Sequence, residues 1–441
     1  MLHVKLPPTF PAERQYICGV VLGEFLGLDY RIEVMERSDV AIGQGDGREL
    51  RLADIFFQTP GDRWLHEASL PTRPLERWAL PGTVFQPTVP VLYGRQYYEV
   101  SSGQIALGLD IFGSLFFLLT RYEEAVRRGR APAASESLAA AECYADRPLA
   151  DEYVEILWRA LQTLWPGLER KARESRVLLS HDIITPTSGS YAGVAVHTAG
   201  DLVKRGSPLL AVRRLAGSVR SLTGHPEADV YNTFDLMMNT AEKYGYKSAF
   251  YFRTDSPAAS PVGQPWMQGV MRRIAERGHE VGLAAGSAPG QDPEQLRHEF
   301  GLLLRVAERA GIRQGTWGGR QQGLRWDPGS TWAAWASAGL DFDSSVGWTD
   351  RNGFRCGTCR AYPVFDVVRR RPLALRERPL IATDTAVLDG KRLPPEEAAK
   401  ELPRLRERCR LVGGDFVMQW RNDRLAADRE REIFLQVVRG L

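Results

Sequence analysis

The residues with the clearest potential for chemistry are His181 and Asp182, which follow the largely apolar segment 177–180. Imidazole and carboxylate groups can hold a divalent metal or transfer a proton. His279 stands just before a second such segment, 280–283, so His181, Asp182 and His279 together are one candidate metal site. A hydrogen-bonded histidine in the core or beside the site is the simpler role for both imidazoles, and we favour it.

Cys356 and Cys359 have the C-x-x-C spacing of a zinc knuckle or a redox pair. No second pair lies nearby in the sequence, so a role as a loop staple or in packing is the favoured interpretation. The chain has five cysteines, an odd number, which argues against a secreted disulfide framework and predicts a reducing, cytoplasmic location.

The elements that must position these residues follow an α/β pattern. Apolar spacing in the first third predicts a helix over 13–26, strands at 30–34, 54–57 and 89–93, and helices over 110–125 and 150–164. A charged linker at 169–175 suggests two domains, 1–172 and 173–441. From residue 176 onward strands and helices alternate, which favours a barrel-like parallel sheet. The predicted segments are 177–180, 230–244, 248–252, 266–277, 280–283, 293–310, 315–318, 330–337, 380–383, 394–409, 416–420 and 429–438.

Composition narrows the class of partner. The 441 residues contain 57 Lys and Arg against 54 Asp and Glu, a net charge of +3 that does not indicate nucleic-acid binding. The early prolines and charges leave no room for the apolar core of a signal peptide. No uncharged apolar stretch is long enough for a membrane span.

Several segments resemble, in order, those of the polysaccharide deacetylase family, also called carbohydrate esterase family four or the NodB homology domain. The resemblance is closest to its two-domain intracellular bacterial branch and covers nearly the whole chain. It implies an α/β fold: a C-terminal deformed (β/α) barrel of NodB type after a smaller N-terminal α/β domain of unknown role. The matching segments are 110–114, 119–124, 152–158, 180–182, 231–235, 278–283, 318–321 and 354–359.

The resemblance also identifies what this chain lacks. The family holds a divalent metal, usually zinc, through one aspartate and two histidines, and the corresponding positions here are Ile184, Ala284 and Ala288. The family's catalytic base is kept as Asp182, but the histidine that acts as general acid is replaced by Arg421, which cannot shuttle a proton near neutral pH. We therefore expect no cofactor, and zinc or another divalent metal only if the site is rearranged.

By the family pattern Arg320 orients the base and Asp384 holds that arginine, so Asp182, Arg320 and Asp384 are the predicted remnant of the catalytic network. The alternative is a buried ion pair without a ligand. Arg421 adds positive charge to the same place and would suit a uronate or a phosphate better than a neutral acetamide. The predicted substrate-binding residues are Arg421, Asn422, Gln322, Trp326 and Trp348, the two tryptophans as platforms for sugar faces.

Three functions are compatible with these residues. The first is a metal-less relative that binds a glycan or sugar precursor, or that regulates an active deacetylase or biosynthetic partner, in surface-polysaccharide metabolism. The second is a working metal-dependent deacetylase or hydrolase of N- or O-acetylated sugars with a rearranged site. The third is a structural subunit that docks on a partner through a helical, basic insertion at about 188–228, which contains Lys204, Arg205, Arg213 and Arg214.

Overall fold

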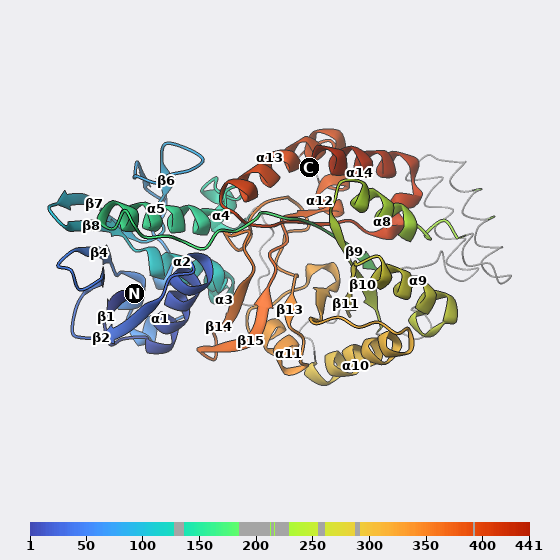
Figure 1. Cartoon of the computed structure of the whole chain (residues 1–441), viewed down its shortest axis with the longest axis horizontal. Coiled ribbons are helices and arrows are strands. Elements are labelled where there is room, and N and C mark those ends of the chain that lie inside the picture. Colours follow the sequence, from blue (N-terminus) through green and yellow to red (C-terminus); the bar gives the residue numbers. More distant parts are fainter. Residues whose placement is uncertain are drawn as a thin grey trace.

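The computed structural model describes residues 1–127, 136–184, 229–254, 261–286, 292–390 and 393–441, with Val212 and Ala216. The described part is a mixed α/β structure with two principal sheets, one in each half of the chain (Figure 1). Apart from Val212 and Ala216, the predicted insertion at 188–228 lies outside the described residues, and so do its four basic residues and the predicted ligand position Ala288. Within the described residues, no helix combines the length and the apolar character that a membrane crossing requires.

The N-terminal sheet has six strands in the order β2-β1-β3-β4-β8-β7. Strands β1, β2, β4 and β8 run parallel to one another, whereas β3 and β7 run antiparallel to their neighbours. The bounds are β1 Leu2–Leu6, β2 Tyr30–Val34, β3 Asp39–Gly43, β4 Glu49–Ala53, β7 Gly94–Ser101 and β8 Gln104–Leu109, and a separate hairpin pairs β5 Arg77–Trp78 with β6 Val89–Pro90.

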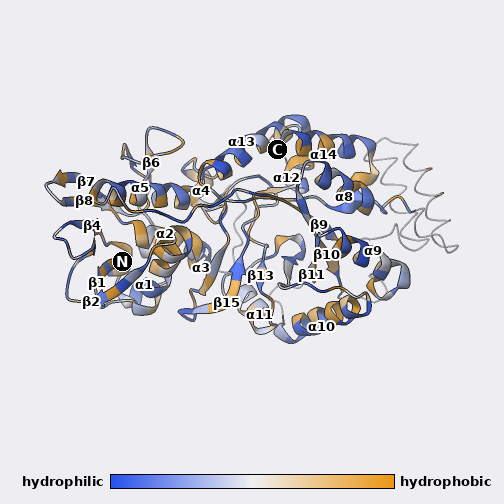
Figure 2. Ribbon diagram, viewed as in Figure 1, coloured by the Kyte–Doolittle hydropathy of each residue, from blue (hydrophilic) through white to orange (hydrophobic). Residues whose placement is uncertain are grey.

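Helices pack on this sheet through apolar residues. The helix α2 (Ile111–Leu119) is buried along its whole length, and most of it is hydrophobic in Figure 2. The predicted helix over 110–125 is interrupted at Arg121, whose φ of 55° lies in the left-handed region, so that a second helix begins there. The other helical segments are α1 Pro11–Cys18, the π-helical continuation η1 Gly19–Phe25, α3 Tyr122–Val126, α4 Leu138–Ala141 and α5 Leu149–Leu164.

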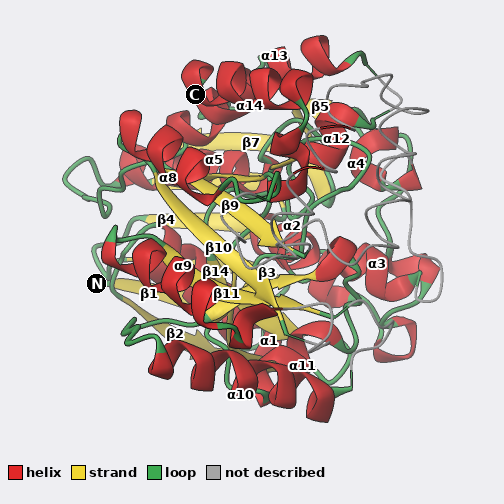
Figure 3. Cartoon of the chain, turned by 90° about the vertical axis from the view of Figure 1, so that its right-hand side faces the viewer, coloured by secondary structure: helices red, strands yellow, loops and turns green. Residues whose placement is uncertain are grey.

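The second sheet has nine strands in the order β14-β15-β13-β12-β11-β10-β9-β17-β16, and every neighbouring pair except β14 and β15 is parallel. Helices surround its central strands (Figure 3). The strands are β9 Val177–Ile183, β10 Lys247–Arg253, β11 Glu280–Ala285, β12 Gly318–Gln321, β13 Phe342–Asp343, β14 Tyr362–Asp366, β15 Arg371–Glu377, β16 Ala382–Thr383 and β17 Phe416–Gln419. The helices are α8 Phe234–Lys243, α9 Pro265–Glu276, α10 Pro293–Arg309, α11 Thr331–Ser337, α12 Asp384–Leu388, α13 Pro395–Leu411 and α14 Asp428–Gly440.

The nine-stranded sheet is strongly curled. Arg320 on β12 bonds directly to Asp182 on β9, although β10 and β11 lie between these strands in the sheet. The ladder of described strands nevertheless ends at β14 on one side and β16 on the other, without pairing between them. The parallel α/β sheet is as expected, and closure into a NodB-type barrel stays a prediction.

The two halves are joined by buried polar contacts. Arg355 donates to both carboxylate oxygens of Glu124, at 3.0 and 2.6 Å, and Arg121 pairs with the same carboxylate at 2.7 Å. Asp151 on α5 accepts hydrogen bonds from Thr358 Oγ1 and the backbone N–H of Cys359. Because these groups are almost fully shielded from water, the segment 354–360 belongs to the interior of both halves.

Candidate functional site

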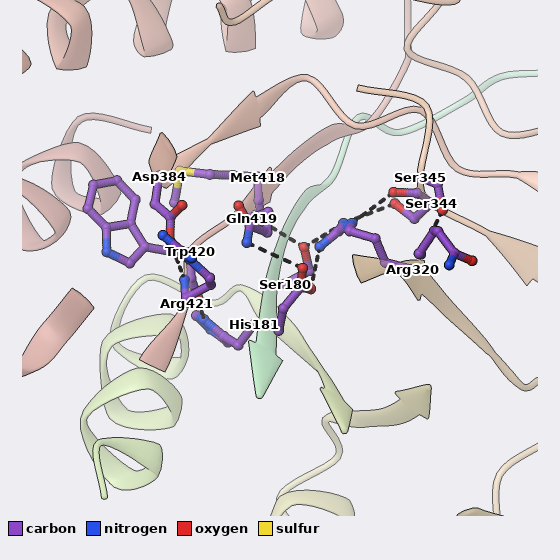
Figure 4. Close-up of polar contacts among 12 residues, drawn as sticks. Ser180, His181, Arg320, Ser344, Ser345, Asp384, Met418, Gln419, Trp420 and Arg421 are labelled. Carbon is purple, nitrogen blue, oxygen red and sulfur yellow. Dashed lines mark hydrogen bonds and ion pairs between the residues drawn. The ribbon is translucent and has the colours of Figure 1, made fainter. Parts of the chain in front are cut away.

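The site lies at the carboxyl ends of the parallel strands of the curled sheet. Ser180 and Asp182 are two residues apart on β9, so their side chains lie on the same face of the strand. Arg320 reaches both of them, with Nη1 at 2.8 Å from Asp182 Oδ1 and Nη2 at 2.9 Å from Ser180 Oγ. Figure 4 shows this arginine between Ser180 and Ser344. The predicted pairing of Asp182 with Arg320 is present.

The remaining donors and faces of Arg320 are also used. Its Nε donates to the carbonyl of Ser344 at 2.8 Å, Nη2 donates to Ser344 Oγ at 3.1 Å, and the ring of Tyr251 lies 5.2 Å from the guanidinium carbon. The other carboxylate oxygen of Asp182, Oδ2, accepts from Gln419 Nε2 at 3.3 Å. Both carboxylate oxygens of the predicted base are therefore engaged by protein groups.

Burial raises the pKa of Asp182, and Arg320 opposes that rise. The neighbouring His181 points to the other face of β9, where its ring lies 4.9 Å from that of Phe250 and its Nδ1 is 2.8 Å from the carbonyl of Trp420. Burial lowers the pKa of His181 to about 4, so this imidazole is neutral at neutral pH. His181 is thus a hydrogen-bonded histidine packed between the sheet and the helices, which is the role favoured for it over that of a metal ligand.

The partner of Asp384 corrects one prediction. Asp384 was expected to hold Arg320, but in the described residues it bonds instead to Arg421, whose backbone N–H and Nε lie 2.8 and 3.1 Å from Oδ2. Figure 4 shows this pair apart from the contacts of Arg320. Asp384 begins α12 directly after the short strand β16, and Arg421 follows β17. Because β16 and β17 are neighbours in the sheet, their ends bring Asp384 and Arg421 together. The carboxylate raises the pKa of Arg421 despite burial, and its side chain is 27% exposed.

The positions that correspond to metal ligands do not fit a zinc site. Ile184 is partly buried just past β9, and Ala284 on β11 is 2% exposed in a small apolar cluster with Ala249, Tyr251 and Phe342. Neither side chain has a donor atom for a metal. Asp182, the nearest carboxylate, already accepts from Arg320 and Gln419. Elsewhere in the described part of the chain, no three His, Cys, Asp or Glu side chains come together in a metal-binding arrangement.

The alternative ligand set of His181, Asp182 and His279 is also not assembled. His181 and Asp182 point to opposite faces of β9. His279 lies before β11, where Nδ1 accepts from the backbone of Ser248 at 3.1 Å and Nε2 is 3.1 Å from Glu242 Oε1. Burial lowers the pKa of His279, with Glu242 acting in the opposite direction. Alternation of side chains along a strand separates these groups.

The two tryptophans predicted as sugar platforms are interior residues. Trp326 and Trp348 are each 6% exposed. The ring of Trp326 packs edge-on against Trp332, with 4.7 Å between centroids, and Arg355 lies 5.7 Å from it. Arg351 lies 5.6 Å from the ring of Trp348. Their loop positions suggested exposure, but these loops fold inward against the sheet, so neither ring presents a face to a ligand.

Asn422 and Gln322 have different surroundings. Asn422 is 1% exposed, and its Nδ2 donates to the backbone carbonyl of Tyr231 at 3.2 Å. The backbone carbonyl of Asn422 accepts from Thr233 Oγ1, so this residue connects segment 231–233 to the end of β17. That is a structural role rather than the predicted ligand contact. Gln322 is partly buried beside β12, and no contact assigns it to a ligand.

The C-x-x-C pair lies in the joint between the halves. Cys356 and Cys359 are buried free thiols, and burial raises the pKa of Cys356 to about 12. Cys359 Sγ lies 3.5 Å from Asp151 Oδ2 and is buried with Cys409 on α13. Buried thiols with raised pKa values are unreactive, which agrees with the packing role.

Ser180, Ser344, Gln419 and Tyr251 complete the network of Asp182 and Arg320 but were not predicted from the sequence. Ser180 could have been found, because side chains two apart on a strand share a face. Tyr251 lies on β10, Gln419 on β17 and Ser344 just after β13, and no spacing along the chain indicates that they meet.

A pair of buried carboxyl groups lies one strand further on. Asp343 on β13 is in register with Glu377 on β15, and both side chains are 0% exposed. Glu377 also accepts from Trp332 Nε1 at 3.0 Å and from the backbone of Val346 at 3.1 Å. Burial raises the pKa of both groups, that of Asp343 to about 6, and the neighbouring Asp343 raises the pKa of Glu377 further.

This pair predicts a fall in stability toward alkaline pH. Because the raised pKa values mean that the folded state binds protons at these carboxyls more tightly than the unfolded chain does, stability declines as pH rises from about 4 through the folded-state pKa values. We expect Asp343→Asn to reduce that decline, measured as the free energy of unfolding in urea at pH 5 and pH 8. Asp235→Asn, at a side chain that is 60% exposed, is the matched control and should keep the wild-type pH dependence.

Comparison with known proteins gives one family match and several structural ones. Residues 2–166 match a family of unknown function, DUF7033. One similar solved structure is the Puue allantoinase, which is 12% identical over 62% of this chain and 85% of its own chain, with a TM-score of 0.38. Another is a probable polysaccharide deacetylase from Pseudomonas aeruginosa PAO1, which is 13% identical over 62% of this chain and 86% of its own chain, with a TM-score of 0.38. A search of curated proteins found no match. The structural neighbours thus include polysaccharide deacetylases at low identity and partial coverage, and they assign no activity to this chain.

Proposed function

We propose that this protein binds an acidic glycan or its sugar precursor at the strand-end site around Arg421, and that it does not deacetylate the ligand there. The observation that carries the proposal is the state of Asp182. Its two oxygens are taken by Arg320 and Gln419, and the adjacent positions Ile184 and Ala284 offer no donor for a metal. A metal-dependent deacetylation has no support from such a set of side chains.

The choice of an anionic ligand follows from Arg421. The fixed charge of Asp384, which is 0% exposed, holds Nε of the arginine and orients the rest of the guanidinium. A planar guanidinium that is already held in place recognises carboxylate or phosphate with a smaller loss of entropy than a flexible lysine would. The sugar class comes from the motif resemblance to polysaccharide deacetylases, and regulation of an active relative is compatible with the same binding site.

Binding should depend on Arg421. In titration calorimetry with a glucuronate-containing oligosaccharide, we expect Arg421→Ala to weaken binding about tenfold or more, because charge-assisted hydrogen bonds contribute about 1.5–3 kcal/mol. Arg421→Lys, which keeps a cation beside Asp384, should fold normally and bind with intermediate affinity. Arg429→Ala, at an arginine that is 67% exposed on α14, is the control and should bind like the wild type. Equal affinity in all four proteins would refute the role of Arg421.

Zinc content separates this proposal from a working enzyme with a rearranged site. After incubation with zinc and desalting, we expect close to no metal per chain and no release of acetate from acetylated chitooligosaccharides. One zinc per chain together with acetate release would establish the enzyme instead. Binding of the acidic oligosaccharide without zinc would support the proposal.

A further inference from the structure

We propose that the N-terminal half carries a second ligand site, in which Arg370 binds the oxyanion of a small molecule. The site is independent of the one at Arg421, and it is a pocket of about 600 Å³ at one edge of the six-stranded sheet. Its lining includes Phe10, Glu36, Arg37, Ser38, Asp54 and Arg370.

The position of the pocket is that of a ligand site in an α/β sheet. Strands β1, β2 and β4 are parallel, and the pocket is lined by the segments that follow their carboxyl ends: 7–10 after β1, 36–38 after β2, and Asp54 after β4. Open α/β sheets bind ligands in the crevice outside the carboxyl ends of their strands. The N-terminal sheet therefore has a hollow where this class of fold places a site.

Arg370 reaches this pocket from the other half of the chain. It lies in the turn between β14 and β15, which comes down beside α1 in Figure 1, and β15 contacts α1. Its Nε donates to Glu13 Oε1 at 2.5 Å, and its guanidinium carbon lies 4.9 Å from the ring of Phe10 and 5.2 Å from that of Trp64. A carboxylate that is 1% exposed and two aromatic rings thus hold the guanidinium in one orientation.

The edge of Arg370 that bears Nη1 and Nη2 remains for a ligand. These two nitrogens make no hydrogen bond to any residue that the structure describes, and the side chain is 43% exposed. A guanidinium edge presents two parallel N–H donors, which match two oxygens of a carboxylate or phosphate. Because the Nε edge and both ring contacts are already made, an oxyanion would bind without the entropy loss of ordering a free arginine.

The other charges of the pocket are largely satisfied within the protein. Arg14 donates to both oxygens of Asp54, each at 2.8 Å, and Arg37 pairs with Asp39. Glu36 is an exposed carboxylate at the rim and opposes an anion, so Glu36→Gln should strengthen binding. Ser38 and Thr59 add hydroxyl groups to the lining of the same pocket.

Two residues of the pocket hold an uncommon backbone conformation. Phe10 and Arg370 are both non-glycine residues with positive φ, 53° and 57°, and both line the pocket. Such conformations are strained and concentrate at ligand-binding sites. The contact with Glu13 links the two halves at this point through Nε alone, so the Nη edge of this pocket-lining arginine is left for a ligand.

Titration calorimetry on the full chain tests the site, with inorganic phosphate, glucuronate and neutral glucose as probes. We carry out the titrations in the Arg421→Ala background, so that binding at the other proposed site does not contribute. Saturable binding of phosphate or glucuronate, but not of glucose, is expected, and the anion that binds more tightly identifies the ligand as a phosphate or a carboxylate.

Variants assign the binding to Arg370. Arg370→Ala and Arg370→Lys should each weaken it about tenfold or more, since lysine keeps the charge but not the paired donors. Arg371→Ala, at the exposed neighbouring arginine, is the matched control and should bind normally. The proposal is overturned if neither anion binds at millimolar concentration, or if Arg370→Lys, with a wild-type circular dichroism spectrum, binds as tightly as the parent.

Discussion

Replacing Arg320 by alanine is expected to lower the free energy of unfolding by about 3–5 kcal/mol, the usual cost of breaking a buried ion pair by removing one partner. Arg320 is 0% exposed and donates to Asp182, Ser180 and Ser344. Without it, Asp182 is a buried carboxylate with only the hydrogen bond from Gln419. Urea unfolding monitored by tryptophan fluorescence measures the loss.

A double variant separates loss of charge compensation from loss of packing. Asp182→Asn combined with Arg320→Ala has no buried charge at this position, so it should recover part of the stability that Arg320→Ala loses. Arg376→Ala provides a control for removing an arginine from the sheet, because its side chain is 41% exposed and pairs with Glu24 on the surface. We expect a change of about 1 kcal/mol or less there. An equally small change for Arg320→Ala would contradict the buried network.

The second large effect is expected at Glu124, which joins the two halves of the chain. Glu124→Ala should cost about 3–5 kcal/mol, because Arg121 and Arg355 would remain shielded from water without a carboxylate. Chemical unfolding should also become less cooperative, with the N-terminal half separating from the segment 354–360 before the rest unfolds. Limited proteolysis near 354–360 reports that separation directly.

Acidification should reproduce part of this effect. Burial raises the pKa of Glu124, but Arg355 and Arg121 outweigh it and bring the pKa to about 2. A depressed folded-state pKa stabilises the protein above the unfolded value of about 4.3, and that contribution is lost as pH falls toward 2. Glu124→Gln should therefore show a weaker dependence of stability on pH between these values. Glu294→Gln, whose carboxylate is 77% exposed, should behave like the wild type.

Apolar periodicity along the chain was enough to predict much of the local structure. The strand at 30–34 is β2, the helix predicted at 293–310 is α10, and the helix at 150–164 is α5 with one further residue. These elements have a buried stripe or alternating faces that can be read from neighbouring residues. The strands β7, β14 and β15 were not predicted, and two of them, β7 and β15, are partly exposed and lack such a stripe. The strand expected at 54–57 is instead a loop after β4 that leads into the short 3-10 helix Phe56–Gln58.

Residue chemistry alone likewise indicated that Ile184 and Ala284 cannot hold a metal, since that depends only on which atoms the side chains contain. Which side chains come into contact, in contrast, was decided only by the tertiary structure. Asp384 pairs with Arg421 and not Arg320 because β16 lies beside β17, and Trp326 and Trp348 are enclosed because their loops pack inward. The pocket at Arg370 forms from strand ends of one half and a turn of the other, more than 300 residues apart in sequence. Contacts of this range are set by the packing of whole elements, which no local pattern of residues encodes.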